Sequence, residues 1–140
     1  MPETETFRIP KRRQHVSTAR QYIRKALADW GITGELADAV TLSVSELVTN
    51  AVTHCRTPYA QVEVTLTLRE AELMLEVSDP DRDALPRCHD SGPDEEGGRG
   101  LALVEVLADA WGCRREPYAK CVWALFALVK IEGAHAPAGL

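Results

Sequence analysis

The sequence lacks several features that would place it in common functional classes. No apolar run approaches the about 18 residues that a membrane-spanning helix needs, and no apolar stretch typical of a secretory signal follows the polar residues 1–14. The formal net charge is -5, with 16 Lys and Arg against 21 Asp and Glu, so the basic surface that binds nucleic acid non-specifically is not expected. We therefore expect a cytoplasmic protein that binds neither a membrane nor nucleic acid directly.

Cysteine is also scarce, and its spacing excludes the usual metal and redox motifs. The four cysteines form no C-x-x-C pair, and only His54-Cys55 and Cys88-His89 bring two candidate ligands together in sequence. We therefore expect reduced thiols that lie partly in the core. A small metal or redox protein is the weakest of the functional classes that the sequence allows.

The chain does contain enough apolar sequence for one compact domain. Hydrophobic residues make up 45% of its 140 residues, and a domain near this size buries roughly 70% of the surface of its unfolded chain. No internal repeat or shift in composition marks a boundary, so residues 6–131 are expected to form a single domain. Residues 1–5 and 132–140 are polar or rich in Ala, Gly and Pro, and they are expected to be flexible tails.

Hydrophobic periodicity predicts two helices in the first part of the chain. Apolar side chains recur at helical spacing in residues 16–30 and again in residues 36–54. Ser17 or Thr18 can cap the start of the first helix, and Gly31 can end it.

Alternating or continuous apolar patterns predict a sheet around these helices. Five segments are predicted as strands, namely residues 6–9, 62–68, 73–77, 110–116 and 121–130. The last of them is apolar on both faces and should be central. With a third helix from Leu101 to Trp111, this order predicts an α+β fold, a two-layer sandwich with a mostly antiparallel sheet and three helices on one face.

One long segment interrupts this pattern. Residues 79–98 are rich in Pro, Gly and Asp, and a loop of about 20 residues inside a compact domain is commonly a lid or a binding loop. The segment is therefore expected to be a lid or a binding loop.

The second helix carries the first candidate site. Glu46 and Asn50 are four residues apart and share one face, partly shielded from water, with Thr53 on the same polar side. Asn offers a neutral oxygen ligand to Mg²⁺, and Glu can take a proton from an attacking hydroxyl or water. Taken alone, the pair is more often an ordinary contact on a helix surface.

The second candidate site flanks the long loop. Asp79 follows a strand, where its carboxylate could accept a hydrogen bond from an exocyclic amine such as that of adenine, or simply cap the turn before Pro80. The segment Gly97-Gly98-Arg99-Gly100 leads into the third helix, and its free N–H groups favour phosphate. Arg99 could add charge there or be solvated.

Together, in this order, these pieces resemble the motifs of the GHKL (histidine-kinase-like) ATPases. Residues 46–51 with Thr53 and His54 resemble the N-box. Val77-Ser78-Asp79 resembles the next strand and its aspartate, and residues 97–104 resemble the glycine box. The chain is most similar to the stand-alone anti-sigma-factor serine/threonine kinases of actinobacteria.

The resemblance implies a Bergerat ATP-binding fold with a long ATP lid, and ATP and Mg²⁺ as cofactors. It makes Glu46 the catalytic base and Asn50 the Mg²⁺ ligand. It makes Asp79 the adenine-binding residue. Nucleotide contacts are also implied for the following residues: Thr53, Gly97, Gly98, Arg99, Gly100 and Leu101. It further implies phosphoryl transfer to an anti-sigma-factor antagonist by a homodimer that binds a sigma factor.

One departure from the family pattern keeps a second hypothesis open. The family motif after the aspartate usually reads D-x-G-x-G, but here Asp79 is followed by Pro80-Asp81-Arg82-Asp83, without glycine. Pro80 fixes its φ and removes a hydrogen-bond donor, so the adenine pocket is expected to be reshaped. The alternative is therefore a non-catalytic module of the same fold that regulates transcription by protein contact only.

Overall fold

A computed structural model of the chain describes residues 3–80 and 96–128, and for residues 96–100 it describes the backbone alone. The elements in chain order are β1 (Glu3–Pro10), the short 3₁₀ helix η1 (Arg13–His15), α1 (Val16–Asp29), α2 (Gly34–His54), β2 (Gln61–Leu68), β3 (Glu72–Asp79), α4 (Glu96–Leu107), β4 (Ala110–Glu116) and β5 (Ala119–Ala127).

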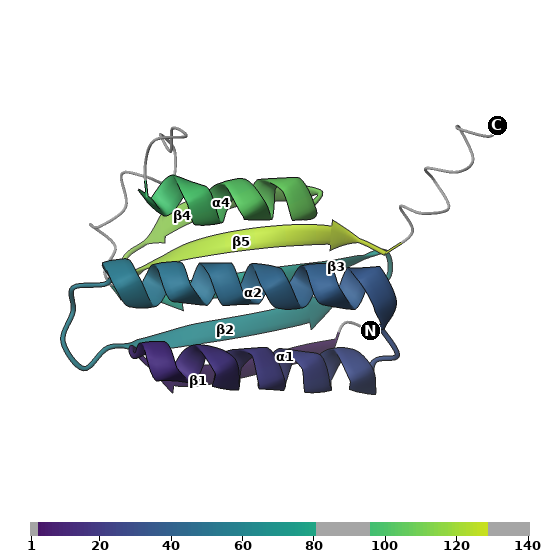
Figure 1. Cartoon of the computed structure of the whole chain (residues 1–140), viewed down its shortest axis with the longest axis horizontal. Helices are drawn as coiled ribbons and strands as arrows, with labels where there is room; N and C mark the ends of the chain where they lie inside the picture. Colours follow the sequence, from purple (N-terminus) through teal and green to yellow (C-terminus); the bar gives the residue numbers. More distant parts are fainter. Residues whose placement is uncertain (1–2, 81–95, 129–140) are drawn as a thin grey trace.

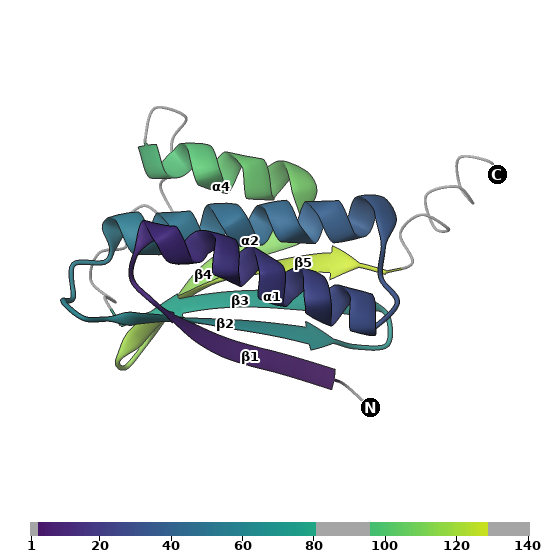
Figure 2. The same ribbon diagram turned by 60° about the horizontal axis from the view of Figure 1, so that its bottom comes forward.

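The strands form one sheet in the order β1-β2-β3-β5-β4, and every neighbouring pair is antiparallel. The three α-helices cover one face of this sheet, with α2 between α1 and α4 (Figures 1 and 2). The predicted two-layer α+β sandwich is confirmed. β5 lies inside the sheet, as expected for a strand that is apolar on both faces.

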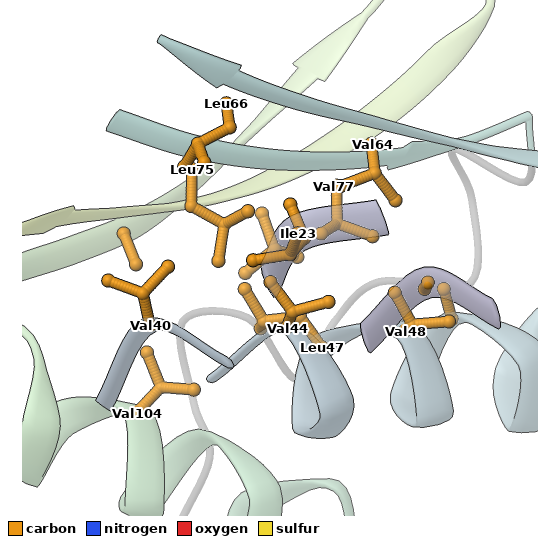
Figure 3. Close-up of a cluster of buried hydrophobic side chains, with 14 of the residues drawn as sticks. Ile23, Val40, Val44, Leu47, Val48, Val64, Leu66, Leu75, Val77 and Val104 are labelled. Carbon is orange, nitrogen blue, oxygen red and sulfur yellow. The ribbon is translucent and has the colours of Figure 1, made fainter. Parts of the chain in front are cut away.

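The core fills the layer between the helices and the sheet. Figure 3 shows Ile23 of α1, Val44 and Val48 of α2, and Leu75 and Val77 of β3 meeting in this layer, and all five are buried. The helices supply one apolar stripe each and the strands supply every second side chain, because the two periods differ. The same pattern that predicted these elements therefore builds the core.

On β3 and β5, the helix-facing side chains form one row of cross-strand pairs. These pairs are Leu73–Phe126, Leu75–Ala124, Val77–Val122 and Asp79–Lys120. The first three are apolar and the last is charged, although all eight residues are buried. The row therefore ends in an ion pair at the point where β3 ends.

Two details near the N-terminus correct the expectations. β1 begins at Glu3, because the backbone of residues 3–5 pairs with that of residues 66–68, so these residues are part of the sheet rather than a loose tail. Neither Ser17 nor Thr18 caps α1, because η1 runs directly into the helix and the Val16 N–H donates to the carbonyl oxygen of Arg13. Residues 132–140 lie outside the described residues.

The cysteines correct a further expectation. Cys55 and Cys121 are buried free thiols, as predicted. Cys113, on β4, is disulfide-bonded, whereas a reduced thiol was expected. Among the described residues, no helix has the length and hydropathy required to cross a membrane.

Candidate functional site

The predicted site residues lie on elements that meet at one end of the sandwich. α2 and α4 run in opposite directions, so the C-terminal half of α2 lies at the same end as the start of α4 (Figures 1 and 2). β3 ends there with Asp79, and β5 begins there with residues 119–120. The fold thus brings together motifs that are separated by up to half of the chain.

Glu46 and Asn50 lie on the side of α2 that is directed toward α4. Leu42 lines a cavity shared with Val106 and Leu107 of α4, and Glu46 and Asn50 follow Leu42 at successive intervals of four residues, which keeps them near the same face. Both side chains are half-buried, as predicted. Their partial shielding follows from the position of this face between the core stripe and solvent.

Thr53 continues this face of α2 but is exposed. α2 ends at His54, and the Cys55 N–H still bonds to the carbonyl oxygen of Ala51. Lys11 Nζ then donates to the carbonyl oxygen of Cys55, 3.0 Å away. A cation near the last carbonyl groups of a helix is favourable, so the end of α2 that carries Asn50 and Thr53 is fixed against the segment after β1.

Asp79 is the last residue of β3, and its carboxylate is buried rather than open to solvent. Only 3% of its surface is exposed, and its Oδ2 lies 3.8 Å from Nζ of Lys120, its cross-strand partner on β5. The distance is that of an ion pair rather than of a direct hydrogen bond. The carboxylate therefore already has one cation beside it inside the protein.

Asp79 lies near Cys55, the residue that directly follows α2. Burial is the main reason that the pKa of Cys55 is raised, and the negative charge of Asp79 raises it further, against hydrogen bonds from Thr57 that lower it. Such an electrostatic effect requires the two groups to be near each other. Asp79 is therefore close to the segment that directly follows Asn50 and Thr53.

The glycine-rich segment differs from the expectation. Residues 97–100 were expected to form a turn that leads into the helix, but they belong to the first turns of α4, which begins at Glu96. Local helix propensity disfavours glycine, and the packing of α4 on α2 overrides that preference. The first four N–H groups of a helix have no partner within it, so the positive end of α4 falls on this glycine segment.

Two further predicted residues stand apart. The side chain of Leu101 is 3% exposed and packs in the hydrophobic core, so only its backbone could face a ligand. The side chain of Arg99 and residues 81–95 of the predicted lid, residues 79–98, lie outside what the structure describes.

Lys120 is the residue that the sequence analysis missed. It is 5% exposed and is the partner of Asp79 across two strands. A signal was present, because Lys120 directly precedes the apolar strand predicted for residues 121–130, and lysine is rarely buried without a partner. The identity of the partner depended on the register between β3 and β5, which the sequence does not reveal.

The donor set fits Mg²⁺ and a purine nucleotide. The amide oxygen of Asn50 is an oxygen ligand, and Mg²⁺ bound with phosphates keeps several waters and needs few protein ligands. In the ranges that the structure describes, no group of three or more His, Cys, Asp or Glu is placed so that it could hold a metal ion. A helix start favours phosphate, and the Asp79 carboxylate can accept a hydrogen bond from a base.

Comparisons with known proteins agree with this arrangement. The model of a family described as "Histidine kinase-like ATPase domain" matches residues 9–126. A comparison with curated proteins finds no match.

Two solved structures share the fold. The RsbU and RsbW domains of Rv1364c from Mycobacterium tuberculosis align with 89% of this chain and 32% of that one, at 19% identity and a TM-score of 0.67. The histidine kinase domain of a blue-light activated histidine kinase, EL346 from Erythrobacter litoralis, aligns with 89% of this chain and 64% of that one, at 19% identity and a TM-score of 0.59. The chain therefore spans less than two thirds of either structure, and the likeness establishes a Bergerat-like fold.

Proposed function

The chain belongs to the histidine kinase-like ATPase domain family, which it matches over residues 9–126, and from this premise we propose that it is an ATP-dependent protein kinase that regulates transcription. It transfers the γ-phosphoryl group of ATP to a serine or threonine of an anti-sigma-factor antagonist. The observation that carries the proposal is the convergence of the C-terminal half of α2, the start of α4 and the end of β3.

In this proposal α2 supplies the metal ligand and the base. The amide oxygen of Asn50 would hold Mg²⁺, which would supply charge neutralisation at the phosphates. Glu46, one helical turn away on the same face, accepts the proton of the attacking hydroxyl. Half-burial keeps both groups positioned and partly screened from water, which suits phosphoryl transfer because its catalysis is mainly positioning and charge stabilisation.

The remaining elements bind the nucleotide at its two ends. The N–H groups at the start of α4, around residues 97–100, lie beside the phosphates, with Arg99 adding charge. Asp79 accepts a hydrogen bond from the exocyclic amine of adenine. Thr53, exposed at the end of α2, extends the polar wall, and Leu101 contributes through its backbone.

The proposed partners follow from the resemblance to anti-sigma-factor kinases. They are a sigma factor, which the protein sequesters, and the antagonist that it phosphorylates, and the protein acts as a homodimer. One of the two similar structures contains an RsbW domain, which is in line with this assignment. Its low identity limits the support to the fold.

A second candidate function rests on the state of Asp79. Its carboxylate is enclosed and paired with Lys120, and the residues after it lack the family glycines. These features favour a non-catalytic module that uses the same fold for protein contact alone. The two candidates differ in whether a phosphoryl group is transferred.

Calorimetric titration with Mg-ATP, followed by incubation with radiolabelled ATP and a candidate antagonist, separates the two functions. The kinase proposal expects saturable binding and a phosphoserine or phosphothreonine on the antagonist. If Mg-ATP binds but no phosphoryl group reaches the antagonist, and Glu46→Ala gives the same binding and transfer results as wild type, the non-catalytic module is the function that remains. Absence of binding at millimolar Mg-ATP would remove the nucleotide from either account.

A further inference from the structure

The cavity that Leu42 shares with Val106 and Leu107 lies between α2 and α4, toward the end of these helices opposite to Asn50. It has a volume of about 450 Å³ and is closed on one side by the end of β5. This volume falls within the about 300–1,000 Å³ that is typical of ligand pockets. Nothing in the proposed kinase reaction uses this cavity.

The cavity is distinct from the candidate nucleotide site. Leu42 lines it, and Asn50 lies eight residues further along α2, which corresponds to roughly 12 Å at 1.5 Å per residue. On α4 the lining residues are Val106 and Leu107, at the opposite end from the glycine segment. A ligand in this cavity therefore contacts the same two helices without occupying the nucleotide site.

The floor and the lips of the cavity are apolar. Phe126 of β5 is 1% exposed and forms part of the floor, and Leu36 of α2 is half-buried beside it. Leu42 of α2 and Val106 of α4 lie at the opening of the cavity and are 42% and 79% exposed. Large apolar side chains left in water around a cavity mark an interaction site more often than isolated exposed ones do.

The rim carries charge of one sign. The lining residues include Glu35, Asp38 and Asp109, and no Lys or Arg lines the cavity among the residues that the structure describes. Asp109 is held in place, because its Oδ2 accepts the N–H of Ala127 at 2.7 Å. The three carboxylates leave the rim complementary to a cation that sits above an apolar floor.

We propose that this cavity is a docking site for a segment of a partner protein in which an apolar anchor side chain is flanked by Lys or Arg. The apolar anchor fills the floor between Leu36 and Phe126, and the cations lie against Asp38 and Glu35. A neutral or acidic segment would bury the same apolar area but would face the three carboxylates without compensation. The acidic rim therefore selects the basic segment.

The probe for this proposal is a short amphipathic peptide of Leu and Lys, titrated into the ¹⁵N-labelled full-length chain. We expect the amide signals of Leu42, Val106 and Ala127 to shift in a saturable manner, while that of Asn50 moves less. A matched peptide of Leu and Glu, and one of Ser and Lys without the apolar anchors, should each bind at least about tenfold more weakly, a difference of roughly 1.4 kcal/mol. Binding should also weaken as salt is raised.

Charge reversal provides the control within the protein. Asp38→Lys should weaken binding of the Leu–Lys peptide about tenfold, whereas Glu5→Lys, an equal change of charge on the exposed outer strand β1, should leave it unchanged. Leu42→Glu should weaken binding because it removes an apolar side chain from the opening of the cavity. Equal binding of the two Leu peptides, or equal effects of Asp38→Lys and Glu5→Lys, would overturn the proposal.

Two other occupants give different results in the same experiment. If a second copy of this chain covers the cavity, the signals of Leu42 and Val106 will change with protein concentration alone, and Leu42→Glu will shift the oligomeric state. If the C-terminal residues of this chain fill it, Ile131→Asp will move those signals without any peptide. Either result rejects the partner segment. None of these outcomes depends on ATP binding, so they are separate from the test of the proposed kinase function.

Discussion

Asp79 and Lys120 face each other across β3 and β5, and their charged groups lie 3.8 Å apart where the two side chains are only 2% and 6% exposed. The pair ends a row of apolar cross-strand contacts. Removing two charges from water is costly, and their mutual attraction offsets that cost only when both are present. The pair therefore links the stability of the fold to the residue proposed to bind adenine.

The first prediction concerns this pair. Lys120→Met should lower the free energy of unfolding by about 3 kcal/mol, because it leaves a buried carboxylate without its counter-charge. Arg114→Met is the matched control. Arg114 lies 2.7 Å from Glu76, but its side chain is 46% exposed, so the loss should stay below about 1 kcal/mol. Urea unfolding of both variants measures the difference, and equal losses would contradict the buried-pair account.

A double variant tests whether the charge itself is responsible. Asp79→Asn combined with Lys120→Met removes both charges, so it should be more stable than Lys120→Met alone. Additive losses in the double variant would show that packing, and not the ion pair, accounts for the first result.

The second prediction concerns Asn50. Asn50→Ala should weaken binding of Mg-ATP at least about tenfold, a loss of about 1.4 kcal/mol, because it removes the proposed oxygen ligand of Mg²⁺. Titration calorimetry measures the affinity. Thr49→Ala is the control, since Thr49 is exposed and adjacent on the helix but does not share the face of Glu46 and Asn50. Equal affinities of wild type and Asn50→Ala would remove Asn50 from the metal site.

The third prediction separates binding from transfer. Glu46→Gln preserves the shape of the side chain and removes its basicity, so Mg-ATP affinity should stay within about twofold while transfer falls roughly 10²–10⁴-fold, the usual contribution of a general base. Single-turnover phosphotransfer from ATP to the antagonist measures the rate. A variant that transfers at the wild-type rate would exclude Glu46 as the base.

Much of the fold could be predicted because its signals are local. The helical spacing of Val40, Val44 and Val48 predicted the buried stripe of α2, and all three are fully buried. The four-residue interval between Glu46 and Asn50 likewise placed both on one half-buried face. The apolar side chains on both faces of β5 predicted its place inside the sheet, although Trp123 and Leu125, on the face away from the helices, are only half-buried.

The features that could not be predicted depend on contacts between distant segments. The partner of Asp79 follows from the register of β3 and β5, which a sequence does not display. The helical state of residues 97–100 runs against the low helix propensity of glycine and follows from the packing of α4 on α2. The apolar cavity at the other end of these helices has no motif, since it combines residues from three separate elements.

The fourth prediction concerns the buried thiols. Burial is the main reason that the pKa values of Cys55 and Cys121 are both raised, and a hydrogen bond with Ser78 partly opposes the effect at Cys121. In the unfolded chain a thiol ionises near about pH 8.5. Below that pH the contribution of the two thiols to the free energy of unfolding is therefore fully present. This contribution should be lost as the pH rises toward their folded pKa values.

The measurement is urea unfolding at several pH values on either side of the ordinary thiol pKa. Replacing Cys55 and Cys121 by Ala should flatten the decline in stability on the alkaline side, even if it lowers stability overall. Alkylation of the native protein by iodoacetamide should also be slow at these two sites, because the thiolate is the reactive form. An unchanged alkaline decline in the Ala variants would assign it to other groups.

The fifth prediction concerns Gly112 on β4, the cross-strand partner of Trp123 on β5. A Cβ atom at Gly112 would lie 2.7 Å from Cζ2 and 2.9 Å from Cε2 of the Trp123 indole. The ring is bulky and held on an interior strand, so Gly112→Ala should lower the free energy of unfolding by about 1–3 kcal/mol, the usual cost of overpacking. Thermal or urea unfolding measures the loss.

Combining Gly112→Ala with Trp123→Val removes the atoms that clash, so the added cost of the alanine should nearly vanish in that background. If Gly112→Ala costs as much in the Trp123→Val background as beside the native tryptophan, steric contact with the ring is not the cause.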